Sequence, residues 1–270
     1  MANLLLPVDF SANARNAAEH AIRLFGPEGN TFVLVHAYLD PNMMDASLPS
    51  MNEALRQAAV EGMGELVSDL RARPGLERAE LRSEVRVGVL PAVMADLVEE
   101  TVPRCIIMGT QGASGLQATL FGSNTADVIK RATVPVLAIP QGSVYRPPAR
   151  IILADDGGVI KAGTLDLLLD IARWSKAEIK IVRVLEEGAD PERMEVSSSY
   201  DDLLGAVPHS HHVMSADNVT TVINDLADQS DADLVVMVHR HLGFFNSLFH
   251  ASSTKRLVMH SHVPLLVLEQ

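Results

Sequence analysis

The stretch CIIMGTQGASGLQATLFGSNTADVIKRATVPVLAIP (105–140) contains the pattern that decides the fold. Its ends, CIIMG (105–109) and VPVLAIP (134–140), are short apolar runs, and an amphipathic helical pattern, GSNTADVIKRAT (122–133), lies between them. Two apolar strands joined by a helix are typical of a parallel β-α-β unit, whose sheet is covered on both faces. The loop after the first strand holds more glycines than a connection needs. A glycine-rich loop that leads into a helix N-terminus can hold phosphate.

The same alternation of strands and helices extends back to the start of the chain. The predicted strands are NLLLPVD (3–9), TFVLVHAY (31–38) and ELRSEVRVG (80–88). The predicted helices are SANARNAAEHAIRLF (11–25), NEALRQAAVEGMGELVSDLRAR (52–73) and LPAVMADLVEETV (90–102). Ser11 is a suitable N-cap for the first helix. Strands that alternate with helices predict a parallel sheet with helical crossovers.

The second half repeats this order of elements. RIILADD (150–156), EIKIVRVL (178–185), DLVVMV (233–238) and VPLLVLE (263–269) correspond to the strands of the first half. The stretch between them, QGSVYRPPAR (141–150), has the composition of a linker. The sequence therefore predicts two tandem α/β domains, each an open five-stranded parallel sheet of Rossmann-like type. Their expected boundaries are 1–142 and 150–270, with a linker at 143–149.

Charge and composition exclude several classes of partner. The formal net charge of −12 disfavours a nucleic acid backbone or an anionic membrane surface, which both need a basic face. No apolar stretch approaches the roughly 20 residues that span a bilayer. Cys105 is the only cysteine, so no intrachain disulfide can form, and the N-terminal MANLLLPVDF is predicted to be a strand, not a signal peptide. We expect a cytoplasmic protein.

The loop after Gly109 lies at the carboxyl end of a predicted strand, where open α/β sheets bind ligands. Gly109 and Gly112 would let the backbone turn sharply and approach a ligand, and Gly122 and Ser123 open a helix whose N–H groups face an anion. The pattern lacks both the P-loop lysine and the dinucleotide fingerprint. From glycine content alone, a phosphate cradle and a flexible linker loop both stay open.

The residues of this loop resemble the signature of the universal stress protein family, G-x2-G-x9-G-[ST]. Gly109, Gly112, Gly122 and Ser123 are in register with it. LLLPVDFS and VLVHAY are similar to the family's first two strands. The resemblance covers both halves, so the chain resembles a tandem universal stress protein. The resemblance favours the phosphate cradle over the linker loop.

The resemblance implies that the first half binds ATP, alone or with Mg²⁺, at the carboxyl edge of its sheet. The adenosine end would contact Pro7, Val8 and Asp9 together with the backbone of Ala37. The loop would contribute residues that begin with Met108, and the helix start would hold the phosphates. The loop and phosphate residues implied are Met108, Gly109, Gln111, Gly112, Gly122, Ser123 and Asn124. The family also implies pairing through the final strand, as an internal pseudo-dimer of VPVLAIP with VPLLVLE or as a homodimer.

The second half lacks the glycines of this loop. Val238, His241 and Ala251 stand at the positions of the three signature glycines. Val238 is expected to resist a positive φ, and His241 would occupy phosphate space. This half is therefore predicted to be a structural partner with a degenerate site.

Eight of the ten histidines lie in the second half, and HSHH (209–212) and HRH (239–241) could converge at one sheet edge to bind a metal. No zinc-protease or zinc-finger spacing is present, so we predict no resident metal and keep a metal or small-ligand site as an alternative.

The function predicted from the sequence is that of a nucleotide-dependent sensing or interaction module in the stress response, which binds an adenine nucleotide and an unidentified protein partner. No catalytic residue is assigned, because the loop has no lysine and Asp9 is the only candidate acid or base. A slow nucleotide hydrolase of the same fold is the alternative enzyme, and neither nucleic acid nor membrane is an expected partner.

Overall fold

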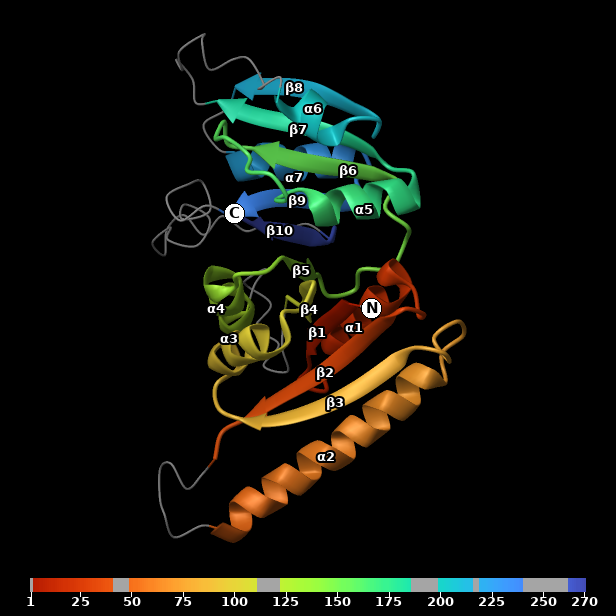
Figure 1. The fold of residues 1–270 in the computed structure, drawn as a ribbon, viewed down its shortest axis with the longest axis vertical. Helices are drawn as coiled ribbons and strands as arrows, with labels where there is room; N and C mark the ends of the chain where they lie inside the picture. Colours follow the sequence, from red (N-terminus) through yellow and green to blue (C-terminus); the bar gives the residue numbers. More distant parts are fainter. Residues whose placement is uncertain (1, 41–48, 111–121, 186–198, 216–218, 240–261) are drawn as a thin grey trace. The chain divides into compact units, whose positions relative to one another are not determined.

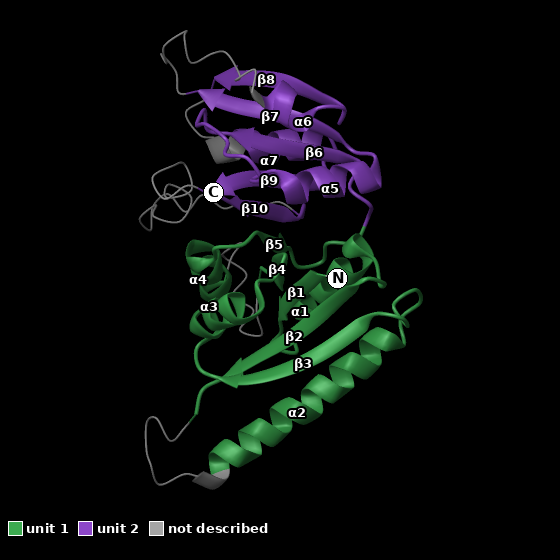
Figure 2. Ribbon diagram, in the orientation of Figure 1, with its two compact units in different colours: residues 1–145 green, residues 146–270 purple. Residues whose placement is uncertain are grey.

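A computed structural model of the chain describes residues 2–40, 49–110, 122–185, 199–215, 219–239 and 262–270. It divides into two compact units, unit 1 from Met1 to Tyr145 and unit 2 from Arg146 to Gln270 (Figure 2). Each unit is an α/β structure with a parallel sheet (Figure 1). None of the helices in these described ranges has the length and apolarity needed to cross a membrane.

Unit 1 has five strands and four helices among its described residues (Figure 1). In chain order they are β1 (Ala2–Pro7), α1 (Ala12–Phe25), β2 (Asn30–Tyr38), α2 (Pro49–Arg71), β3 (Glu80–Val87), α3 (Leu90–Thr101), β4 (Cys105–Gly109), α4 (Ser123–Arg131) and β5 (Val136–Ile139). These elements follow the order that the sequence predicts. The predicted N-cap is also found, because the Ser11 hydroxyl accepts a hydrogen bond from the Ala14 N–H at 3.1 Å.

The strands of unit 1 are parallel and lie in the order β3-β2-β1-β4-β5. The chain moves outward from β1 to β3 and then crosses to β4 and β5 on the other side of β1. Right-handed crossovers therefore place α1 and α2 on one face of the sheet and α3 and α4 on the other. The central strands are buried on both faces, as their continuous apolar sequences require. The reversal of direction falls between β1 and β4.

Unit 2 repeats this plan. Its described elements are β6 (Arg150–Asp155), α5 (Asp166–Ser175), β7 (Glu178–Leu185), α6 (Ser199–Leu204), β8 (His209–Ser215), α7 (Val219–Gln229), β9 (Leu234–His239) and β10 (Leu265–Glu269). The parallel strands lie in the order β8-β7-β6-β9-β10, so each strand corresponds to the one at the same place in the order β3-β2-β1-β4-β5 of unit 1. The prediction of two tandem five-stranded parallel sheets is confirmed.

The strand registers show which positions of the two units are equivalent. Leu4 pairs with Phe32 and Cys105 in unit 1, and Ile151 pairs with Ile179 and Leu234 in unit 2. Counting along the strands from these pairs makes Val8 equivalent to Asp155, His36 to Arg183, and Gly109 to Val238. The neighbouring outer strands support the equivalence of Gly109 and Val238, because Gly109 pairs with Ile139 of β5 and Val238 pairs with Leu268 of β10.

Candidate functional site

A cavity of about 140 Å³ lies at the carboxyl ends of β1 and β4, where the strand order of unit 1 reverses. This is the position at which open α/β sheets bind ligands. Nine of the eleven residues predicted for the nucleotide site line it. They are Pro7, Val8, Asp9, Ala37, Met108, Gly109, Gly122, Ser123 and Asn124. The two others, Gln111 and Gly112, lie outside the described residues.

Three lining residues were not predicted from the sequence. Ala14 comes from the first turn of α1, Leu90 begins α3, and Thr125 lies in the first turn of α4. The buried Thr125 hydroxyl donates a hydrogen bond to the Gly109 carbonyl at 3.0 Å, which fixes the start of α4 over the end of β4. No local sequence pattern indicates this contact, because the Gly109 carbonyl lies 16 residues before Thr125 in the chain.

Gly109 is required for a reason that differs from the predicted one. It continues strand β4 and does not take the positive φ that a sharp turn would need. A Cβ at this position would instead lie 2.6 Å from Asn13 Nδ2 and 3.2 Å from the Asn13 backbone carbon. The glycine therefore allows α1 to pack closely against β4, which a side chain would prevent. The predicted turn at Gly109 is wrong, and the close approach is to a helix of the same unit.

Gly122 has no such packing requirement. It is the N-cap of α4, with φ −60° and ψ 158°, and a Cβ there would meet only the Thr110 carbonyl oxygen at 3.5 Å. As a glycine, Gly122 has no side chain with which to cap α4. The N–H groups of Ser123, Asn124 and Thr125 in its first turn have no acceptors within the helix, and the positive end of the helix dipole lies at the cavity. This geometry suits an anion.

Asp9 is held in place by the turn that starts α1. Its carboxylate accepts a hydrogen bond from the Ser11 N–H at 3.0 Å, and Ser11 in turn caps the helix. Asp9 is the only acidic residue among the described residues that line the cavity, and these include neither lysine nor arginine. The α4 N-terminus is therefore the main source of positive potential in this lining.

His36 supports the part of the cavity wall that lies next to β2. Its Nδ1–H donates a hydrogen bond to the Val8 carbonyl at 2.8 Å, which joins the ends of β1 and β2. The Phe10 ring lies 4.4 Å from the imidazole, centroid to centroid, and Phe10 takes a positive φ of 63°. These contacts support the backbone of Val8 at the cavity edge.

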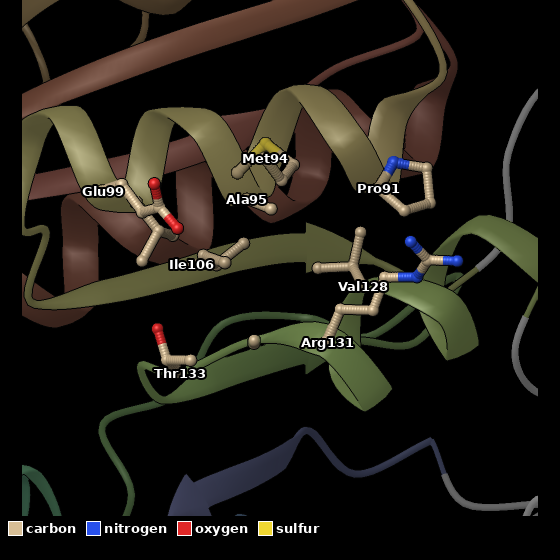
Figure 3. Close-up of a pocket in the computed structure, with 10 residues that line it drawn as sticks. Pro91, Met94, Ala95, Glu99, Ile106, Val128, Arg131 and Thr133 are labelled. Carbon is tan, nitrogen blue, oxygen red and sulfur yellow. The ribbon is translucent and has the colours of Figure 1, made fainter.

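A second hollow in unit 1 is smaller and lies elsewhere. It occupies about 80 Å³ between α3 and α4 and is lined mainly by apolar residues, with Glu99 and Arg131 at its edge (Figure 3). None of the predicted site residues lines it. Cys105 is buried in the neighbouring strand β4, and burial raises the pKa of its thiol to about 12, so it has no nucleophilic role.

In unit 2 a buried ion pair occupies the region equivalent to the base of this cavity. Arg183, at the position of His36, donates through Nε to the carboxylate of Asp155 at 2.8 Å. Tyr200 donates its hydroxyl proton to the other carboxylate oxygen at 3.0 Å, and burial and this carboxylate raise the pKa of the phenol. The Asp155 side chain is fully buried, and that of Arg183 is 8% exposed.

Among the described residues of unit 2, the histidines of HSHH (209–212) lie apart from His239 and do not converge with it as the sequence analysis allowed. His239 ends β9, where its Nδ1 lies 2.7 Å from Glu269, whereas His209 begins β8. The strands are parallel, so these residues lie at opposite ends of the sheet. His241, His250 and His260 lie outside the described residues.

Comparisons with known proteins agree with this architecture. A model of the universal stress protein family matches residues 1–140 and 148–269. A universal stress protein of Methanocaldococcus jannaschii is 28% identical over 148 residues, which are 50% of this chain and 80% of that protein. The structure of a universal stress protein from Archaeoglobus fulgidus covers 100% of this chain and 96% of its own, with 19% identity and a TM-score of 0.74. A functionally unknown Pseudomonas aeruginosa protein covers 100% and 92%, with 16% identity and a TM-score of 0.63.

Proposed function

Because this chain belongs to the universal stress protein family, we propose that its unit 1 binds an adenine nucleotide, ATP, in the cavity at the ends of β1 and β4. The observation that carries the proposal is the composition of this cavity, which brings residues of β1, β2 and β4 together with an uncapped helix start. At about 140 Å³ the part enclosed by described residues is smaller than the roughly 300 Å³ of a typical ligand pocket. It would enclose part of a nucleotide.

The cavity has two chemically different ends. Pro7, Val8 and Ala37 offer apolar surface and backbone groups suited to an adenosine moiety, with the Asp9 carboxylate available to a ribose hydroxyl. At the other end, Ser123 and Asn124 present backbone N–H groups and polar side chains suited to phosphate. Because the described lining has no lysine or arginine, Mg²⁺ would assist by neutralising part of the phosphate charge.

The role that follows is a nucleotide-dependent sensing or interaction module in the stress response. Bound ATP would contact both the end of β4 and the start of α4. A protein partner would recognise the surface that these contacts stabilise. Efficient hydrolysis is not part of the proposal. Asp9 already accepts the Ser11 N–H, and no second acid or base lies among the described lining residues.

Calorimetry of the intact chain with MgATP tests the proposal, with Gly122→Ala and Gly122→Val as graded variants. A Cβ fits the extended backbone of Gly122 and its 3.5 Å contact with the Thr110 carbonyl oxygen, so the fold should not change in the alanine variant. We expect one site per chain, weakened at least about tenfold by alanine and further by valine, since a Cβ would occupy the space that the phosphates approach.

Gly64→Ala is the matched control, because Gly64 lies in α2 and a Cβ there meets nothing within 4 Å. It should leave ATP binding unchanged and stabilise the helix by about 0.5–1 kcal/mol. Unchanged ATP affinity in both Gly122 variants, or no binding to the unaltered chain at millimolar MgATP, would overturn the proposal.

A further inference from the structure

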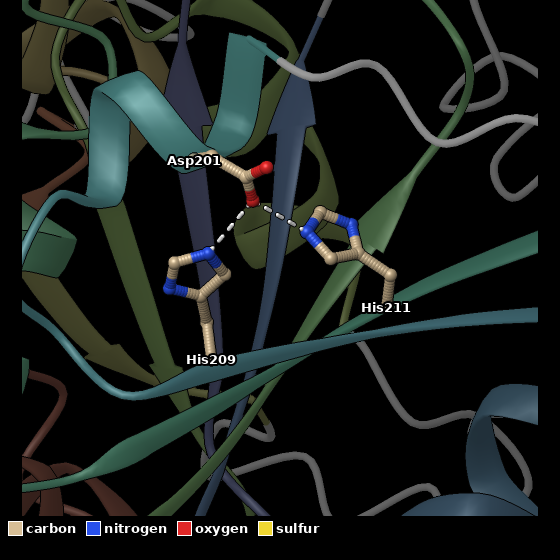
Figure 4. A group of neighbouring side chains, drawn as sticks. All are labelled: Asp201, His209 and His211. Atoms are coloured by element: carbon tan, nitrogen blue, oxygen red, sulfur yellow. Dashed lines mark hydrogen bonds and ion pairs between the residues drawn. The ribbon is translucent and has the colours of Figure 1, made fainter.

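Three potential metal ligands meet on the outer strand of the unit 2 sheet. His209 and His211 are two residues apart on β8, so their side chains lie on the same face of the strand. Asp201 reaches this face from α6, and one of its carboxylate oxygens lies 3.0 Å from Nε2 of His209 and 2.9 Å from Nε2 of His211 (Figure 4). One ligand atom from each side chain lies within 4.8 Å of the other two.

The hydrogen bond from His209 to Val207 determines which ring nitrogen faces Asp201. Its Nδ1 lies 2.8 Å from the Val207 carbonyl oxygen, which can only accept a hydrogen bond, so Nδ1 carries a proton. In the neutral ring Nε2 then has no proton and presents a lone pair. That lone pair would face the lone pairs of the Asp201 carboxylate. A cation among the three groups would be bound by both this lone pair and the carboxylate oxygen.

The surroundings hold these ligands in place. The hydrogen bond to Val207 orients the His209 ring, as outer-shell carbonyl groups do for histidines that bind metals. Asp201 is positioned by its neighbour Tyr200, which is buried and hydrogen-bonded to Asp155. The His209 and His211 side chains are 15% and 31% exposed, so the site is open to solvent on one side.

We propose that His209, His211 and Asp201 bind a divalent transition-metal ion of the Zn²⁺ class, with a water molecule as the fourth ligand. Two imidazoles and one carboxylate are a donor set that suits Zn²⁺, and imidazole also suits Cu²⁺ and Ni²⁺. Tetrahedral Zn²⁺ with bonds of about 2.0–2.1 Å separates its ligand atoms by about 3.3 Å. The separations of the Asp201 oxygen from the two histidine nitrogens, 3.0 and 2.9 Å, are close to this value. The site lies in unit 2 and does not depend on the nucleotide site of unit 1.

Zn²⁺ binding to the intact, chelator-stripped chain tests this proposal, measured by competition with a chromophoric zinc indicator at pH 7.5. We expect a site of micromolar or tighter affinity that weakens at least about 100-fold in the His209→Ala/His211→Ala double variant. Asp201→Asn, which keeps the shape of the side chain but removes its charge, should weaken the site about tenfold. Replacement of Zn²⁺ by Co²⁺ should give the intense visible absorption of a tetrahedral site, which the double variant should lose.

His212→Ala is the matched control. His212 lies on the same strand, but its Nε2 is 2.9 Å from the Ser210 hydroxyl, and alternation along β8 places it on the other face. This variant should bind Zn²⁺ like the unaltered chain. Equal Zn²⁺ affinity in the double variant and in His212→Ala would assign the binding to other histidines and overturn the proposal. Absence of binding below millimolar Zn²⁺ would also overturn it, and the contact with Asp201 would then be an imidazolium ion pair.

Discussion

The two units place different chemistry on equivalent backbone positions. In unit 1 the end of β1 is joined to β2 by a neutral hydrogen bond from His36 to the Val8 carbonyl. In unit 2 the same junction is made by the Arg183–Asp155 ion pair, to which Tyr200 contributes a further hydrogen bond. The junction of unit 1 adjoins a cavity, whereas the junction of unit 2 consists of larger side chains that are buried. The same fold therefore joins equivalent strand ends in two chemically different ways.

The largest effect is expected when the unit 2 junction is broken. Asp155→Ala would leave the buried Arg183 guanidinium without its carboxylate and would also remove the acceptor of Tyr200 and of the Gly157 N–H. We expect a loss of about 3–5 kcal/mol in the free energy of unfolding, as is typical when one partner of a buried ion pair is removed. Urea unfolding followed through Trp174, the only tryptophan and a residue of unit 2, measures this loss.

The matching change in unit 1 should be milder. His36→Ala removes one neutral hydrogen bond and one ring contact, so a loss of about 1–2 kcal/mol is expected. Hydrogen exchange should place the two losses in β6–β7 and β1–β2 respectively. Equal losses of stability for Asp155→Ala and His36→Ala would contradict the view that the ion pair of unit 2 stabilises its junction more than the hydrogen bond of unit 1 does.

Much of this architecture could be predicted from the sequence, because corresponding strand sequences occur in both halves of the chain and support one another. The apolar strand runs recur in the same order, and Ser11 marks the start of α1 by itself. The strand β8 was not predicted. Its sequence HSHHVMS is largely exposed at the edge of the sheet, so it lacks the apolar character that identifies the other strands.

The site could be predicted only in part, for reasons that its residues make clear. The glycine spacing identified the cavity wall, but it could not distinguish a glycine that makes room for a ligand from one that makes room for a helix. Gly122 has free space for a Cβ, whereas Gly109 faces Asn13, which is 96 residues earlier in the chain. The Arg183–Asp155 pair was missed for the same reason, because neither residue indicates its partner locally.

The next largest effect tests this distinction between the two glycines. Gly109→Ala would bring its Cβ to 2.6 Å from Asn13 Nδ2 and 3.2 Å from the Asn13 backbone, and overpacking of this kind costs about 1–3 kcal/mol. Gly122→Ala should cost only about 0.5–1 kcal/mol, because alanine is a poorer N-cap than glycine but meets no close contact. Thermal and urea unfolding of the two variants measure the difference. Combining Gly109→Ala with Asn13→Ala should recover part of the loss, and no recovery would show that the backbone contact, not the amide, limits the packing.

The smallest effect is a pH dependence that belongs to unit 1. His20 in α1 is 4% exposed, its Nδ1–H donates to the Asn16 carbonyl at 3.0 Å, and its Nε2 has no hydrogen-bond partner among the described residues. Burial lowers the pKa of His20 below its ordinary value of 6.5, since a proton on Nε2 would be a buried donor without an acceptor. The unfolded chain therefore takes up this proton at a higher pH than the folded chain does.

The sign of the effect follows from linkage. The stability that His20 contributes is intact above about pH 6.5 and is lost as the pH falls toward the lower pKa of the folded state. His20→Gln, which can still donate to Asn16, should lower stability at pH 7 but flatten its dependence on pH between 7 and 5. Glu19, whose pKa is also lowered, acts below pH 4.5 and so does not interfere in this range. Hydrogen exchange of the α1 amides, corrected for the pH dependence of the intrinsic exchange rate, measures how the stability of unit 1 changes with pH. An unchanged pH dependence in His20→Gln would assign the acid sensitivity to another group.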